Sequence, residues 1–156
     1  LAKMLFANPQ RIDYYDRYQE IIDAYNAEQN RATIEKTFMD LMELASSLDT
    51  EQQRYVREGF SSDEELSVYD LLFSENLTKQ EIETIKKVSV DLLTKIKQQI
   101  AKLDHWTDKQ ETKAIVDNLI RNTLWQELPN SYDVSDIQTY QKKIYEYVYM
   151  RYPEVA

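Results

Sequence analysis

Residues 78–103, which read TKQEIETIKKVSVDLLTKIKQQIAKL, decide the fold of this chain. Apolar residues recur in this stretch at intervals of three and four, which is the spacing of one face of an α-helix. These residues are Ile82, Ile85, Val88, Leu92, Ile96, Ile100 and Leu103. Thr78 and Glu81 have the spacing of a capping box, in which two side chains satisfy the first free N–H groups of a helix. We therefore predict a long helix over residues 79–103.

The same spacing extends in both directions from this segment. Further helices are predicted over 9–27, 31–48, 50–59, 63–73, 108–128 and 136–151. The start signals for these helices are Asn8 before Pro9, Asp49 with Gln52, Ser62 with Glu65, Thr107 with Gln110, and Ser135 with Gln138. The stop signals are Gly59, Pro129 with Asn130, and Pro153.

The tyrosine-rich stretch 144–150 favours a strand, because Tyr145, Tyr147 and Tyr149 alternate. The helical period through Ile137 and Ile144 outweighs this signal, so a helix is predicted there as well. The expected fold is all-α: one domain over residues 1–156, built as an irregular bundle of about six to seven helices.

Composition supports helices joined by short polar links. The 156 residues include one glycine and three prolines, so tight hairpins and glycine-rich phosphate loops have few places to form. No cysteine is present, which excludes disulfides and fits a cytoplasmic location. The sequence contains neither a membrane-length apolar run nor a secretory signal. It starts at Leu1 rather than methionine, from which we expect a piece of a longer polypeptide.

Groups that catalyse reactions are scarce. Gly59 is the only glycine, so a Walker loop or a dinucleotide-binding loop is not expected. His105 is the only histidine, and at a helix junction it is expected to cap or pack rather than to act as a base. The acidic groups at 63–65 and at Asp133 with Asp136 are interpreted as complements to helix dipoles. We therefore expect no catalytic, cofactor-binding or metal-binding residues in this chain.

Two features point towards partners instead. The first is a set of lysines on the 79–103 helix, interpreted as an arc that contacts phosphate or an acidic protein, with an ordinary solvated face as the alternative. These are Lys86, Lys87, Lys95, Lys97 and Lys102. The second is the excess of tyrosine, twelve against four phenylalanines, because tyrosine suits half-wet interfaces. Tyr145, Tyr149 and Tyr152 are the candidate interface, with simple peripheral packing as the alternative.

Charge separates the two halves of the chain. The net charge is −9, and residues 1–77 carry sixteen acidic side chains against seven basic ones. From residue 78 onward twelve acidic side chains are balanced by twelve basic ones. The first half is therefore not expected to wrap nucleic acid, because its acidity repels phosphate.

The order of the segments resembles the C-terminal helical region of type I restriction enzyme R subunits. The resemblance begins with Asn8-Pro9 and the run 14–22, and continues through 31–35 and 38–41. Its most distinctive part is Arg57-Glu58-Gly59-Phe60 followed by Glu64-Glu65-Leu66 and Tyr69-Asp70-Leu71-Leu72. Later matches are Leu77-Thr78, 85–88, Leu92-Leu93, Ile96-Lys97, Trp106, Lys109, Lys113-Ala114, Leu128-Pro129 and Tyr132.

This resemblance implies a non-catalytic piece of an ATP-driven DNA translocase and nuclease. ATP and magnesium would act in other parts of the parent enzyme, which would be a site-specific deoxyribonuclease. The expected partners are the methyltransferase and specificity subunits and the motor domains of the same chain, with DNA secondary and no membrane. Assembly is the favoured function, and contact with the DNA backbone beside the motor is the alternative.

Overall fold

The computed structural model describes residues 1–153, and this part of the chain is helical with no strand, which confirms the all-α prediction. Six of its eight α-helices have seven or more residues, as the predicted bundle of six to seven requires. The α-helices are α1 (Ala2–Ala7), α2 (Ile12–Ala27), α3 (Arg31–Gln52), α4 (Arg54–Arg57), α5 (Asp63–Leu72), α6 (Lys79–Ala101), α7 (Gln110–Glu127) and α8 (Val134–Arg151). Two short 3₁₀ helices, η1 (Pro9–Arg11) and η2 (Trp106–Asp108), precede α2 and α7.

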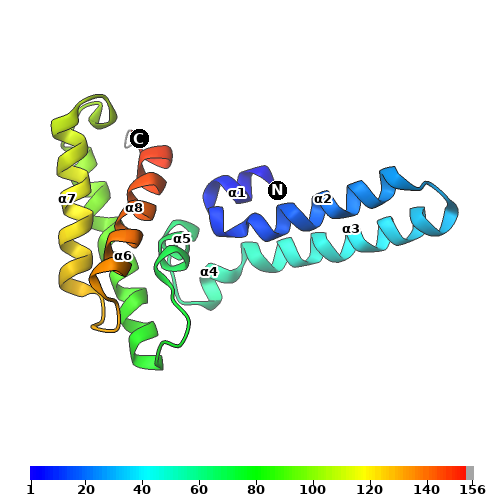
Figure 1. Ribbon diagram of the computed structural model, residues 1–156, viewed down its shortest axis with the longest axis horizontal. Helices are drawn as coiled ribbons and strands as arrows, with labels where there is room; N and C mark the ends of the chain where they lie inside the picture. The colour runs from blue at the N-terminus through cyan, green and yellow to red at the C-terminus, as the bar shows by residue number, and fades with distance from the viewer. Residues whose placement is uncertain (154–156) are drawn as a thin grey trace. The chain divides into compact units, whose positions relative to one another are not determined.

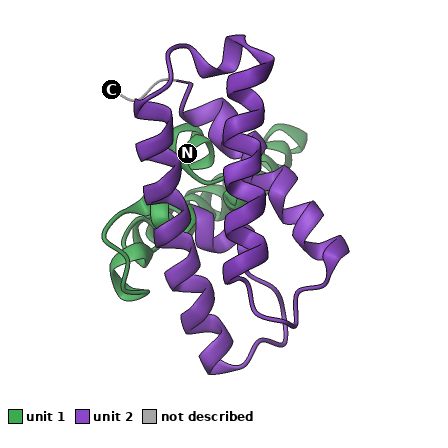
Figure 2. Ribbon diagram, turned by 90° about the vertical axis from the view of Figure 1, so that its left-hand side faces the viewer, with its two compact units in different colours: residues 1–67 green, residues 68–156 purple. Residues whose placement is uncertain are grey.

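The chain divides into two compact units, Leu1–Ser67 and Val68–Ala156, shown in two colours in Figure 2. We call them unit 1 and unit 2. The division falls within α5. Whether residues 1–156 act as one domain remains a prediction.

The core of unit 2 forms around α6, with α7 packed against α6 and α8 packed against α7 (Figure 1). The apolar stripe predicted for α6 is buried, since Ile85, Leu92 and Ile96 are completely enclosed. Ile120 of α7 and Ile144 of α8 are enclosed as well. The tyrosine-rich stretch 144–150 is helical, so packing of its period-3.6 face prevails over strand propensity.

Helix starts in unit 2 agree with the sequence at α6 and differ at α7 and α8. Thr78 and Glu81 form the predicted capping box. The box predicted for Ser135 is wrong, because Asp133 and Asp136 have the same spacing two residues earlier and start α8 there. The box predicted for Thr107 is also wrong. That residue lies inside η2, and α7 begins at Gln110 without a side-chain cap.

Unit 1 contains α1, η1, the antiparallel pair α2–α3, α4 and the first residues of α5 (Figure 1). The sequence did not predict α1, which is a short helix with no side-chain cap. The predicted helix start at Asp49 is wrong, because α3 continues unbroken to residue 52, and its last turn carries Glu51, which is buried and accepts a hydrogen bond from Arg11. The predicted start at Ser62 is confirmed: its Oγ accepts a hydrogen bond from the Glu65 backbone at 3.3 Å.

Gly59 supplies the turn that ends α4. Its φ is +85°, a conformation that side-chain-bearing residues rarely adopt, and no atom would meet an added Cβ within 4 Å. Conformation and not crowding therefore requires glycine at this position, as its use as a stop signal predicted.

Among residues 1–153, none of the helices combines the length and the apolar character that a bilayer-spanning segment requires.

Candidate interaction surfaces

An aromatic cluster holds the end of α8 against η2 in unit 2. Trp106 is completely buried, and its Nε1 donates a hydrogen bond to the Tyr152 carbonyl at 2.7 Å. The rings of Tyr145 and Tyr149 meet Trp106 edge-on, with centroid separations of 6.1 and 5.8 Å. Edge-to-face pairs of this kind each add about 0.5–1.5 kcal/mol beyond burial of area. The cluster therefore fixes the last turns of α8.

All three tyrosines predicted at an interface take part in this cluster. The ring of Tyr152 lies 6.2 Å from that of Tyr147 and under Lys97, whose Nζ is 5.6 Å from the ring centre. Tyr149 nevertheless keeps 40% of its surface exposed. The three tyrosines thus have packing partners within unit 2, and their contact with another protein stays a prediction.

The five predicted contact lysines lie on α6 or at its C-cap, but they are directed to different neighbours. Lys95 pairs with Glu127 of α7 at 3.1 Å. Lys86 lies 4.0 Å from a Glu83 oxygen and 5.9 Å above the Tyr69 ring. The structure also places Lys97 over Tyr152 and leaves Lys87 and Lys102 exposed. The five side chains are therefore divided among separate contacts, and their role towards phosphate stays a prediction.

A hydrogen bond joins two segments that carried the family resemblance. The hydroxyl of Tyr132, after α7, donates to the Leu72 carbonyl at the end of α5 at 2.5 Å. Burial, with smaller effects from the nearby Tyr140 and Asp136, raises the pKa of Tyr132 and keeps this donor protonated. The segment that contains Tyr132 and the end of the Tyr69–Leu72 segment are thus in contact in unit 2.

An ion cluster centred on Arg11 lies in unit 1, and no sequence pattern indicates it. Arg11 is buried; its Nε donates to Glu51 at 2.9 Å and its two terminal nitrogens donate to Asp63 at 3.0 and 2.6 Å. Arg54 also donates to Glu51, at 2.9 Å. Burial disfavours the charge of Arg11, but its hydrogen bonds to Asp63 and Glu51 outweigh that and raise its pKa. The partners are 40 and 52 residues away, so no local spacing could reveal them.

The pKa of Glu51 predicts how this cluster responds to acid. Burial alone would raise it, but hydrogen bonds from Arg54 and Arg11 prevail, and the pKa lies below its ordinary value of 4.5. A lowered native pKa adds stability above the unfolded value, and that stability is lost as pH falls through the native one. We expect Glu51→Gln to lower the urea midpoint most at neutral pH, with the gap to the unsubstituted protein closing in acid.

Urea titrations followed by circular dichroism at a series of pH values measure this gap. Glu35→Gln is the matched control, because Glu35 belongs to an exposed pair with Arg31. A gap for Glu51→Gln that is constant from neutral to acidic pH would contradict the prediction.

The remaining chemistry candidates form no metal cluster among residues 1–153. His105 adopts a left-handed conformation with φ 47° at the junction before η2, and its Nε2 lies 3.4 Å from Asp104. Asp133 and Asp136 cap α8, as described above. The acidic group 63–65 forms the first turn of α5 as predicted, with the added role of Asp63 towards Arg11.

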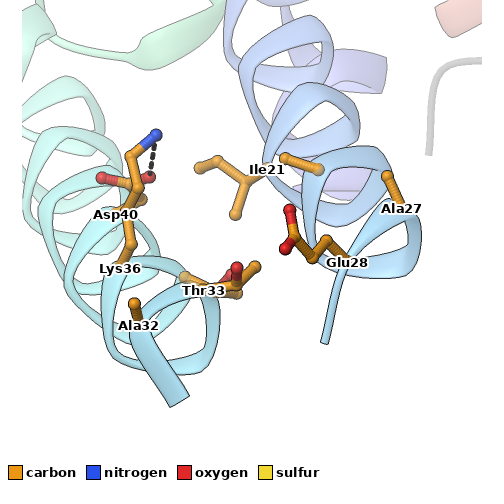
Figure 3. A pocket seen from close by; sticks show the side chains of 9 residues that line it. Ile21, Ala27, Glu28, Ala32, Thr33, Lys36 and Asp40 are labelled. Carbon is orange, nitrogen blue, oxygen red and sulfur yellow. Dashed lines mark ion pairs between the residues drawn. The ribbon is translucent and has the colours of Figure 1, made fainter. Parts of the chain in front are cut away.

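A groove of about 430 Å³ lies between α2 and α3 in unit 1 (Figure 3). Small and polar side chains line it: Ile21, Ala24, Ala27 and Glu28 from α2 and its end, and Ala32, Thr33, Lys36, Thr37 and Asp40 from α3. In Figure 3 Ile21 points into the space between the helices, and Lys36 pairs with Asp40 at 3.9 Å. The groove therefore shows that the side chains fill the seam between the two helices incompletely.

Comparison with known proteins gives one family. The family model described as type I restriction enzyme HindI endonuclease subunit-like, C-terminal, matches residues 6–152. No curated protein and no solved structure matches the chain.

Proposed function

Because the chain belongs to the family of type I restriction enzyme HindI endonuclease subunit-like C-terminal domains, we propose that it is a helical assembly domain. It docks the nuclease and translocase subunit of a restriction complex onto the methyltransferase and specificity subunits. It also contacts the motor domains of its own parent chain. The proposed location of the complex is the cytoplasm.

Exposure of large apolar side chains is the observation that carries this proposal. Fifteen such side chains are exposed among residues 1–153, nine of them in unit 1. Scattered apolar side chains are ordinary on a protein surface, but gathered ones mark sites where another molecule binds. A domain that presents many of them is suited to association.

The chemistry of restriction is assigned in this proposal to other parts of the parent enzyme. ATP and Mg²⁺ act there, and this domain supplies neither a nucleophile nor a ligand to them. It positions the motor by binding its partners through surfaces. The residues matched by the family are therefore fold markers in this account, as Tyr132 and Leu72 illustrate.

Co-purification tests the assembly role. We expect the chain to co-elute in size-exclusion chromatography with the methyltransferase and specificity subunits of the same restriction system. In the absence of these subunits, the chain is expected not to bind duplex DNA. Tyr149→Ala is expected to reduce co-elution, because its exposed edge is the part of the aromatic cluster that a partner can reach. Ile115→Ala, an equally exposed position on α7, is the control.

Separate outcomes contradict the two parts of this prediction. Failure of the unsubstituted chain to co-elute at micromolar concentration contradicts the assembly role. Unchanged co-elution of Tyr149→Ala removes the tyrosines from the interface while leaving the assembly role intact.

Contact with the DNA backbone is the alternative function. It requires affinity for duplex DNA that falls steeply with salt and that weakens in Lys87→Glu with Lys102→Glu, two exposed positions of the lysine set. Lys95 and Lys97 are less informative for this purpose, because their reversal also disturbs contacts with Glu127 and Tyr152.

A further inference from the structure

The α2–α3 pair of unit 1 turns its apolar stripes outward. No residue of α2 is buried, and α3 buries only Leu44 and Glu51. Between the helices lies the groove lined by Thr33, Thr37 and Asp40. A pair of helices normally buries its apolar stripes in the seam, so these stripes must lie elsewhere.

Helical geometry places both stripes on one side of the pair. Five stripe residues directly follow a groove-lining residue, as Ile22 follows Ile21 and Phe38 follows Thr37, and the others continue the same stripe at helical spacing. One residue further along a helix is a rotation of about 100°. Because α2 and α3 run antiparallel, the same rotation brings both stripes to one side of the pair, away from the groove. We call this surface the hairpin face: Tyr15, Tyr18, Ile22 and Tyr25 of α2 with Ile34, Phe38, Leu41 and Ala45 of α3.

Most side chains of the hairpin face are exposed, and Ile22, Tyr25 and Leu41 are half-buried. Phe38 keeps 64% of its surface exposed, and Tyr15, Tyr18 and Ile34 are exposed as well. Their helical spacing gathers these positions along one side of both helices, and gathered apolar side chains are the pattern of a binding site.

Acidic side chains border the hairpin face. The position that follows each stripe residue lies at the outer edge, and these positions include Asp16, Asp23 and Glu35 but no basic residue. One of these carboxylates, that of Glu35, forms an ion pair with Arg31 at 3.2 Å. The segment 12–52 as a whole carries ten acidic and three basic side chains. A second copy of the chain would bring like charges together at these edges.

We infer that the hairpin face binds a helix of a protein partner whose apolar side chains are flanked by lysine or arginine. Apolar side chains of that helix would cover Phe38 and its neighbours, and its basic flanks would meet the carboxylates at the edges. The inference rests on the proposed assembly function, which supplies the partner proteins. The hairpin face lies in unit 1 and is distinct from the tyrosine cluster of unit 2.

Two synthetic helical peptides of about 20 residues, which span about 30 Å, test the inference on the whole chain. Both carry the same leucine stripe, flanked by lysine in one and by glutamate in the other. Fluorescence anisotropy is expected to show binding of the lysine-flanked peptide and roughly tenfold or weaker binding of the other. Higher salt is expected to reduce the difference, since salt screens exposed charges. Equal binding of the two peptides would overturn the basic partner.

Substitutions locate the site. Ile34→Ser and Phe38→Ser are each expected to weaken binding of the lysine-flanked peptide roughly tenfold, as loss of a central apolar anchor does. Ile115→Ser, at an exposed isoleucine of α7, is the matched control and should bind as the unsubstituted chain does. Asp16→Lys with Asp23→Lys should reverse the preference between the peptides. Circular dichroism verifies that each variant is folded, and equal loss in Ile115→Ser would overturn the site.

Further readouts separate this inference from its alternatives. A homodimer that Phe38→Ser dissociates would overturn the basic partner in favour of a second copy. Co-elution with the methyltransferase and specificity subunits reports on the proposed function independently. If the chain co-elutes but does not discriminate between the peptides, the inference is wrong and the assembly role stands. If it discriminates between the peptides but does not co-elute, the assembly role is wrong.

Discussion

Replacement of Trp106 by alanine is expected to destabilise unit 2 by about 3–5 kcal/mol, the usual cost of removing a fully buried tryptophan. The substitution leaves a cavity beneath Tyr145 and Tyr149 and deprives the Tyr152 carbonyl of its indole donor. Urea unfolding followed by far-UV circular dichroism measures the loss. The change should appear as a lower midpoint with helical content retained in the absence of denaturant.

The second tryptophan of the chain provides the control. Trp125 of α7 is 48% exposed, so Trp125→Ala is expected to cost less than about 1 kcal/mol, as surface substitutions do. Equal costs for the two substitutions would contradict the placement of Trp106 in the core.

Replacement of Arg11 by methionine is expected to cost about 3 kcal/mol, because removing one partner of a buried ion pair leaves charge without compensation. Methionine is close in length but makes no hydrogen bond to Glu51 or Asp63. Thermal and urea unfolding of the whole chain measure the loss of stability, which is expected to fall on unit 1, where Arg11 lies. Arg54 still donates to Glu51 in the variant, and this places the expected cost at the low end of the range.

Arg31→Met is the matched control for Arg11→Met. Arg31 also pairs with a glutamate, at 3.2 Å, but its side chain is 94% exposed, and an exposed pair contributes little. A stability unchanged by Arg11→Met would show that the buried ion cluster is not required for folding.

The sequence predicted most of the fold because local signals determine most of it. The α6 stripe and the Thr78 box specify the longest helix to within two residues of its end. Errors arose where two start signals lie close together, as at Ser135 and Asp133, because spacing alone does not say which one the chain uses. The helix α1 lacks a capping side chain, so no start signal marked it.

The surfaces were harder to predict than the helices. The apolar spacing over residues 31–48 predicts a helix with an apolar face, but it does not tell whether that face is buried or exposed. Only the position of Thr33 and Thr37 in the groove shows that the stripe turns outward. The lysines of α6 appeared as one group in the sequence, and contacts such as that of Lys95 with Glu127 divide them. Long-range partners of this kind leave no trace in local spacing.

The position of Arg11 in the chain gives the α2–α3 pair the properties of a lever. Arg11 immediately precedes α2 and Glu51 lies in the last turn of α3, so their hydrogen bond joins the two helices of the pair at the root. The 22 residues of α3 correspond to about 33 Å, and the far tip is held by a seam of threonines and alanines. A force applied across the pair near its tip is therefore transmitted as torque to the ion cluster at its root. Protonation of Glu51 would weaken the hydrogen bonds from Arg11 and Arg54 that hold this root.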